Sequence, residues 1–108
     1  MNQYIQVATT VATEKEAGAI AGLLIEQRLA ACVQVVGPMI SHYRWQGKIE
    51  TSGEYLCLAK SRAALYPQIE AAIKAIHPYE VAEIVAVPII AGSKEYLAWL
   101  GAEVREPS

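Results

Sequence analysis

Two long apolar-rich runs, residues 32–45 and 48–60, occupy the middle of the chain, and Gln46 and Gly47 separate them. Two such runs around a tight turn that contains glycine are typical of a β-hairpin. Each arm has about 12 to 14 residues and spans roughly 40 Å at ~3.3 Å per residue, about twice an ordinary strand. The rest of the chain is too short to cover both ends of such a ribbon. We therefore expect another copy of the chain to bury part of the hairpin.

The segment before the hairpin predicts one strand and one helix. Residues 4–10 alternate well enough between apolar and polar side chains to predict a short strand. Thr13 and Glu16 have the spacing of a capping box, so a helix is expected to begin there. Gly18 and Gly22 weaken this helix, which suggests close packing against a sheet.

The segment after the hairpin predicts a helix, a strand and a last helix. Pro67 belongs in the first turn of a helix, where its missing amide does no harm, and Pro78 ends that helix. The buried stripe of this helix is formed by Ile69, Ala72, Ile73 and Ile76. Residues 83–90 form an apolar run typical of a strand, and Ser93 is expected to cap a terminal helix.

The order of these elements is strand, helix, strand, strand, helix, strand, with one more helix at the end. This order is the split βαβ arrangement of an α+β, ferredoxin-like sandwich. Right-handed crossovers place the first and third strands in the middle of the sheet. Pro38 and Pro88 fall in the second and fourth strands, and proline is tolerated at sheet edges. We therefore predict a single ferredoxin-like domain over residues 1–108, with a long central hairpin.

Composition narrows the class of protein. Hydrophobic residues make up 54% of the chain, which excludes a disordered protein. The net charge is -2 and the basic residues are scattered, so no nucleic-acid or anionic-membrane surface is indicated. The chain has no run of ~18 apolar residues, and its first residues do not resemble a secretion leader. We expect a cytoplasmic protein without a membrane segment.

The two cysteines are expected to be free thiols. In the simplest hairpin register, Cys57 faces Val36 and Cys32 faces Ser61. This register separates the sulfurs by roughly 13 Å, beyond the ~7 Å Cα limit for a disulfide. A bulge at residues 37–38 would shift the register.

Four segments of the chain resemble the CutA divalent-cation-tolerance family. They are RLAACV at residues 28–33, YRWQGKIE at 43–50, HPYEV at 77–81 and YLAWL at 96–100, and they follow the order of the family. The resemblance implies a ferredoxin-like subunit, similar to the nitrogen-regulatory PII proteins, that assembles as a homotrimer. It also implies a role in tolerance of copper and other divalent ions.

The resemblance further implies a copper site near His77. The site proposed for bacterial members uses a thiol near the end of the first strand and two adjacent histidines before the proline. The matching positions here are Thr9, Ile76 and His77, so one imidazole is retained. Cys32 and Glu80 are further candidate metal ligands beside His77.

Each candidate ligand also has a purely structural interpretation. His77 stands at a helix C-terminus, where it either caps the helix or binds a metal. Cys32 packs as a small hydrophobic residue or serves as a thiolate ligand. Glu80 and Glu83 either add oxygen ligands or form a solvated turn, and His42 is expected at a surface or interface. The chain lacks the Cys-x-x-Cys or paired-His spacing of a closed zinc site.

A second hypothesis is a PII-like module that binds a small anion or a protein partner between subunits. The residues that would form the rim of such a cleft are Tyr43, Trp45, Lys60, Arg62 and Tyr79. The chain has no glycine-rich phosphate loop and no nucleophile motif, so neither an enzyme nor an organic cofactor is expected. Our first hypothesis is a copper-binding, homotrimeric metal-tolerance protein.

Overall fold

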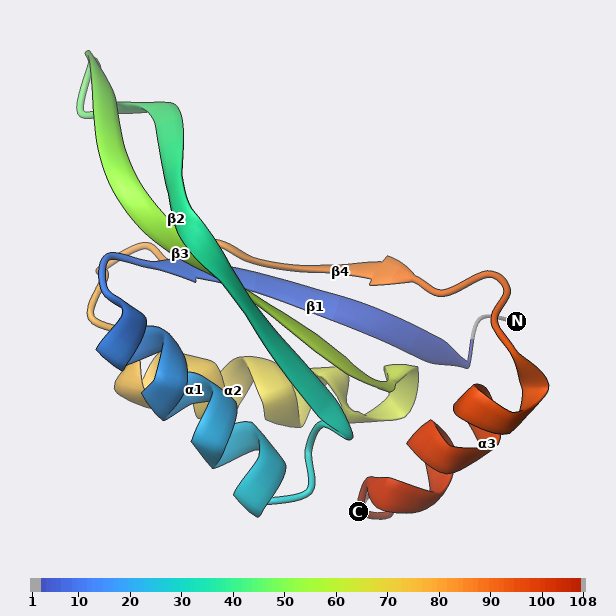
Figure 1. Ribbon diagram of the computed structural model, residues 1–108. Coiled ribbons are helices and arrows are strands. Elements are labelled where there is room, and N and C mark those ends of the chain that lie inside the picture. The colour runs from blue at the N-terminus through green and yellow to red at the C-terminus, as the bar shows by residue number, and fades with distance from the viewer. Residues whose placement is uncertain (1–2, 108) are drawn as a thin grey trace.

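A β-hairpin of unusual length forms the centre of the computed structural model, which describes residues 3–107 (Figure 1). Strands β2 (Cys32–Trp45) and β3 (Lys48–Arg62) have 14 and 15 residues and pair antiparallel. The turn residues Gln46 and Gly47 have φ values of 51° and 79°, and two left-handed residues suit the twist of a hairpin. The predicted hairpin and its turn are therefore confirmed.

The sheet has four strands in the order β2-β3-β1-β4. The central strand β1 (Tyr4–Val11) pairs antiparallel with β3 on one side and with β4 (Ile84–Pro88) on the other. The two proline-containing strands are the edge strands, as the sequence predicted. Strand β4 is shorter than the predicted run of residues 83–90, and it ends at a residue that cannot donate to the ladder.

Helices α1 and α2 cover one face of the sheet, and no helix of the described residues lies over the other face (Figure 1). Helix α1 (Glu14–Glu26) begins with the predicted capping box, in which the Thr13 hydroxyl accepts from the amide of Glu16 over 3.1 Å. A short 3-10 turn, Ala63–Leu65, leads into α2 (Tyr66–Ile76), which has its proline in the first turn.

Helix α3 (Lys94–Glu103) lies at the end of the sheet opposite the hairpin tip (Figure 1). The Ser93 hydroxyl caps it by accepting from the amide of Tyr96 over 3.1 Å. Arg28 ties this helix to the rest of the molecule, because its guanidinium donates to the carbonyl of Glu103 over 3.0 Å. The N-cap predicted at Ser93 is confirmed.

The core lies between the helices and the covered face of the sheet. Its largest fully buried side chains include Val7, Val11, Ile20, Leu24, Leu29, Leu65, Ile69 and Ile73. We expected Gly18 and Gly22 to mark close packing of α1 against the sheet, and within this chain that expectation is wrong. Both glycines are exposed, and a Cβ at either position would meet no heavy atom within 4 Å.

A β-bulge divides the hairpin into two parts. Val36 pairs with Leu56 and Met39 with Glu54, so two residues of β2 oppose a single residue, Tyr55, of β3. The predicted register therefore holds only on the turn side of the bulge.

On the other side of the bulge, the predicted register is wrong by one residue. Cys57 faces Val35 and Cys32 faces Lys60. Cys57 is three residues, or roughly 10 Å along β3, from Lys60, the residue that faces Cys32. Both cysteines are free thiols, as expected.

Candidate functional site

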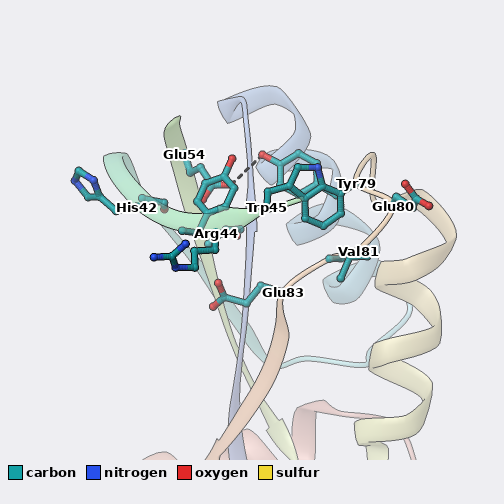
Figure 2. Close-up of a pocket in the computed structure, with 12 residues that line it drawn as sticks. His42, Arg44, Trp45, Glu54, Tyr79, Glu80, Val81 and Glu83 are labelled. Atoms are coloured by element: carbon teal, nitrogen blue, oxygen red, sulfur yellow. Dashed lines mark hydrogen bonds between the residues drawn. The ribbon is translucent and has the colours of Figure 1, made fainter. Parts of the chain in front are cut away.

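A cavity of about 710 Å³ lies between the turn half of the hairpin and the loop that joins α2 to β4 (Figure 2). We call it the hairpin pocket. Its lining consists of Thr10, residues 41–45, Glu54 and residues 79–83. Two of the four segments that resemble the CutA family, residues 43–50 and 77–81, therefore meet at this pocket.

Pairing in the turn half of the hairpin decides which side chains of β2 share a face with Glu54. Met39 pairs directly with Glu54, and directly paired residues in antiparallel strands project to the same face. Side chains alternate along a strand, so Tyr43 and Trp45 project to that same face. His42 projects to the opposite face, and its ring points away from the cavity in Figure 2.

Glu54 and Tyr79 form the polar centre of the pocket. Glu54 is only 5% exposed, and its Oε2 accepts from the Tyr79 hydroxyl over 2.9 Å. Burial raises the pKa of Tyr79 to about 12, and the hydrogen bond to the Glu54 carboxylate and the charge of that carboxylate add to the rise. Tyr79 is therefore a neutral hydrogen-bond donor at neutral pH.

His77 uses both of its ring nitrogens within the chain. Its Nδ1 accepts from the amide of Tyr79 over 3.1 Å and therefore carries no proton. Its Nε2 lies 2.9 Å from the carbonyl oxygen of Thr10 and must donate to it. The ring thus joins the end of α2 to the end of β1 and positions Tyr79, and a metal at either nitrogen would displace one of these bonds.

The three metal ligands proposed from the sequence are not brought together in one chain. Cys32 faces Lys60, which faces Gln6 of β1, whereas His77 contacts Thr10, four residues or roughly 13 Å further along β1. The Cys32 thiol instead lies beside Tyr96. Burial raises the pKa of the Tyr96 hydroxyl, and this thiol adds to the rise.

Glu80 lines the hairpin pocket with Glu83. His42, which the sequence placed at a surface, has its Nδ1 3.2 Å from the Thr51 hydroxyl. Across residues 3–107, no three His, Cys, Asp or Glu side chains converge closely enough to hold a metal ion.

The rim proposed for a small anion is also divided within one chain. Tyr43, Trp45 and Tyr79 line the hairpin pocket. Lys60 instead lines a smaller cavity of about 320 Å³ near the start of α3, and Arg62 lies 3.9 Å from Glu106. A cleft that uses all five residues would need Lys60 and Arg62 from a neighbouring subunit.

Glu54 is the site residue that reading the sequence missed. It stands between Gly53 and Tyr55 in a strand, where a charged side chain is ordinarily solvated. Its burial depends on the loop after α2, which is distant in sequence, so no local pattern could have identified it.

Comparison with known proteins places the chain in a family. The family model of the CutA1 divalent ion tolerance protein matches residues 5–103. The chain belongs to this family. The CutA resemblance and the fold predicted from the sequence are therefore confirmed.

Relatives of the CutA family resemble the chain over most of its length. The divalent-cation tolerance protein CutA of Thermus thermophilus is 48% identical over 94 residues, which are 87% of this chain and 91% of that protein. Human protein CutA is 42% identical over 91 residues, 84% of this chain. These residues are 51% of the human protein, so the chain spans about half of its length.

Solved structures of CutA proteins have the same fold. The Thermus thermophilus structure superimposes with a TM-score of 0.92 at 44% identity and covers 94% of this chain and 99% of its own. The CutA1 structure from Oryza sativa gives a TM-score of 0.94 at 38% identity and covers 97% of this chain and 96% of its own. Within residues 3–107, no helix is both long enough and apolar enough to cross a membrane.

Proposed function

We propose that this CutA-family protein acts in divalent-cation tolerance by binding a divalent metal ion, copper before other ions, as a homotrimer. Family membership supports the link to divalent cations. The metal is cargo in this proposal rather than a resident cofactor, and the role is binding rather than catalysis. We also propose a cytoplasmic location, although two relatives are named chloroplastic and one structure is titled periplasmic.

Unpaired apolar side chains on the hairpin and on the opposite edge of the sheet support assembly. Ile40 and Ile49 are each 70% exposed on the turn half of the hairpin, and Val85 and Val87 of β4 are about half exposed. An exposed apolar edge strand invites pairing with another chain. Closed rotational symmetry would cover the same surface on every copy.

The observation that carries the metal proposal is a set of donor atoms without an internal partner. Among the described residues, Nε2 of His42 and the carboxylates of Glu80 and Glu83 have no hydrogen bond or ion pair, and the Cys32 thiol forms no disulfide. Nitrogen and sulfur donors favour copper over magnesium or calcium. Since one chain brings no three donors together, we propose that neighbouring subunits complete the site.

Competition titration against a chelator of known affinity tests this proposal. We expect copper to bind more tightly than zinc, and magnesium not to compete. Binding should weaken as the pH falls, because an imidazole must be deprotonated to coordinate a metal. Analytical ultracentrifugation of the same samples should show a trimer at micromolar concentration.

The variants His42→Ala, His77→Ala and Cys32→Ser assign the donors. Loss of copper in His42→Ala alone would identify the solvent-facing imidazole. Loss in His77→Ala would mean that copper displaces either the Tyr79 amide or the Thr10 carbonyl from the ring. Unchanged copper affinity in all three variants would contradict the proposal.

A PII-like anion site is the second candidate function. The observation that favours it is the smaller cavity, of about 320 Å³. Its lining includes the cationic residue Lys60 and no Asp or Glu. Titration with phosphate and a nucleotide panel would test it, and we expect Lys60→Gln to remove any such binding.

A further inference from the structure

The hairpin pocket contains a buried carboxylate that no cation of the described chain balances. Glu54 is 5% exposed, and its single hydrogen bond is the one from Tyr79 to Oε2. Within residues 3–107, no Lys, Arg or His nitrogen lies within 4.0 Å of it. A carboxylate removed from water is costly unless a cation or further hydrogen-bond donors compensate it. The second oxygen of Glu54 is thus a strong acceptor for a cation that carries N–H groups.

Aromatic rings form the wall beside this carboxylate. Tyr43 and Trp45 come from β2 and Tyr79 from the loop after α2, and all three line the cavity (Figure 2). They are between 36% and 44% exposed, so part of each ring remains open to a ligand. Aromatic faces attract organic cations and pack well against methylene groups.

The outer part of the pocket is also acidic. Glu80 and Glu83 come from the loop after α2, and the one guanidinium of the lining belongs to Arg44. Glu83 and Arg44 lie on the same side of the cavity in Figure 2, without an ion pair between them. With three carboxylates against one guanidinium, the lining favours a ligand with more than one positive charge.

A bare metal ion fits this pocket poorly. No three His, Cys, Asp or Glu side chains of the described residues converge, whereas zinc takes about four protein or water ligands and calcium at least about six. An alkylammonium ion needs one carboxylate and apolar or aromatic walls. The cavity of about 710 Å³ is also in the range of small-molecule sites, roughly 300–1,000 Å³.

We infer that the hairpin pocket binds a linear aliphatic di- or polyamine. One primary ammonium group donates to the open oxygen of Glu54, the methylene chain lies against Tyr43, Trp45 and Tyr79, and a second ammonium group reaches Glu80 or Glu83. This inference goes beyond metal tolerance and does not depend on it. Copper titration therefore tests one proposal and amine titration the other.

Trp45 provides the readout. The chain has two tryptophans, and Trp99 lies in α3, outside the lining of the pocket. In the full-length Trp99→Phe protein, the remaining tryptophan fluorescence reports on the pocket. We expect spermidine to change this fluorescence saturably, butylamine to act at higher concentration, and magnesium chloride at matched ionic strength to have no effect.

Glu54→Gln in the Trp99→Phe background is the decisive variant. The amide keeps the shape of the side chain and an acceptor for Tyr79 but removes the charge, so spermidine affinity should fall by at least about tenfold. The matched control is Glu26→Gln, which removes the same charge from an exposed position in α1 and should leave affinity unchanged.

Three results would overturn the inference. Equal weakening by Glu54→Gln and Glu26→Gln would show nonspecific attraction to net charge. Displacement of spermidine by magnesium at equal ionic strength would show the same. No response to spermidine, combined with loss of the trimer in Glu54→Gln, would show that a cationic side chain of a neighbouring copy fills the pocket instead.

Discussion

The Tyr79 hydroxyl lies 2.9 Å from Oε2 of Glu54, so the loop after α2 is bonded to β3 across the hairpin pocket. Removing the hydroxyl leaves a buried carboxylate without its donor. We expect Tyr79→Phe to lower the free energy of unfolding by about 1–3 kcal/mol, measured by urea denaturation. Tyr43→Phe is the control, because the Tyr43 hydroxyl contacts Ser52 in an exposed pair, and it should cost less than about 0.5 kcal/mol. Equal costs would show that the buried carboxylate does not need this donor.

Tyr79 also makes stability depend on pH in alkali. Its pKa is about 12 in the folded chain and about 10 in an unfolded one, so between these values the folded state retains a proton that the unfolded state has lost. This contribution to stability is complete below about pH 10 and disappears as the pH rises towards 12. The free-energy difference between wild type and Tyr79→Phe should therefore shrink over this interval. A difference that stayed constant would contradict the raised pKa.

Two buried hydroxyls should respond in opposite ways to removal. The Thr9 hydroxyl has no hydrogen-bond partner among the described residues, so Thr9→Val should be neutral or stabilising by up to about 1 kcal/mol. The Ser61 hydroxyl donates to the carbonyl of Leu29 over 2.6 Å, so Ser61→Ala should cost about 1 kcal/mol or more. Thermal and urea unfolding of the two variants compare them directly. Destabilisation by Thr9→Val equal to that by Ser61→Ala would imply an undetected partner for Thr9.

Helix α1 can be stabilised at its exposed glycines. A Cβ at Gly18 or Gly22 would meet no heavy atom within 4 Å, so replacement by alanine should raise the unfolding free energy by about 0.5–1 kcal/mol at each position. Gly37→Ala is the opposing control, because its Cβ would lie 2.5 Å from the ring of Tyr55. We expect that variant to unfold at a lower urea concentration. No gain at Gly18 or Gly22 would indicate that another copy of the chain covers α1.

Local chemistry in the sequence was sufficient for the element order and for much of the topology. The capping residues Thr13 and Ser93 mark helix starts through bonds to amides three residues away, so they can be recognised without tertiary information. Pro38 and Pro88 identified the edge strands for an equally local reason, the absence of an amide hydrogen.

The site could be predicted only in part, because its geometry depends on distant contacts. The sequence selected Tyr43, Trp45 and Tyr79, and they share a pocket. It grouped them with Lys60, although the hairpin turn lies between Trp45 and Lys60 and the latter stands near the far end of a 15-residue strand. His77 was proposed as a ligand, but the amide and carbonyl that occupy its nitrogens belong to a loop and a strand whose approach no sequence spacing reveals.

The bulge opposite Tyr55 shifts the alternation of β2 by one residue between its two halves. Even-numbered residues of β2 pair with even-numbered residues of β3 on the side away from the turn, and odd-numbered residues do so on the turn side. Met39 pairs with Glu54 on the turn side, and removal of the extra residue would leave this pairing unchanged. A one-residue deletion at the bulge should therefore give a regular ladder in which Tyr43 and Trp45 still project to the face of Glu54, so this arm can lose a residue without losing the pocket.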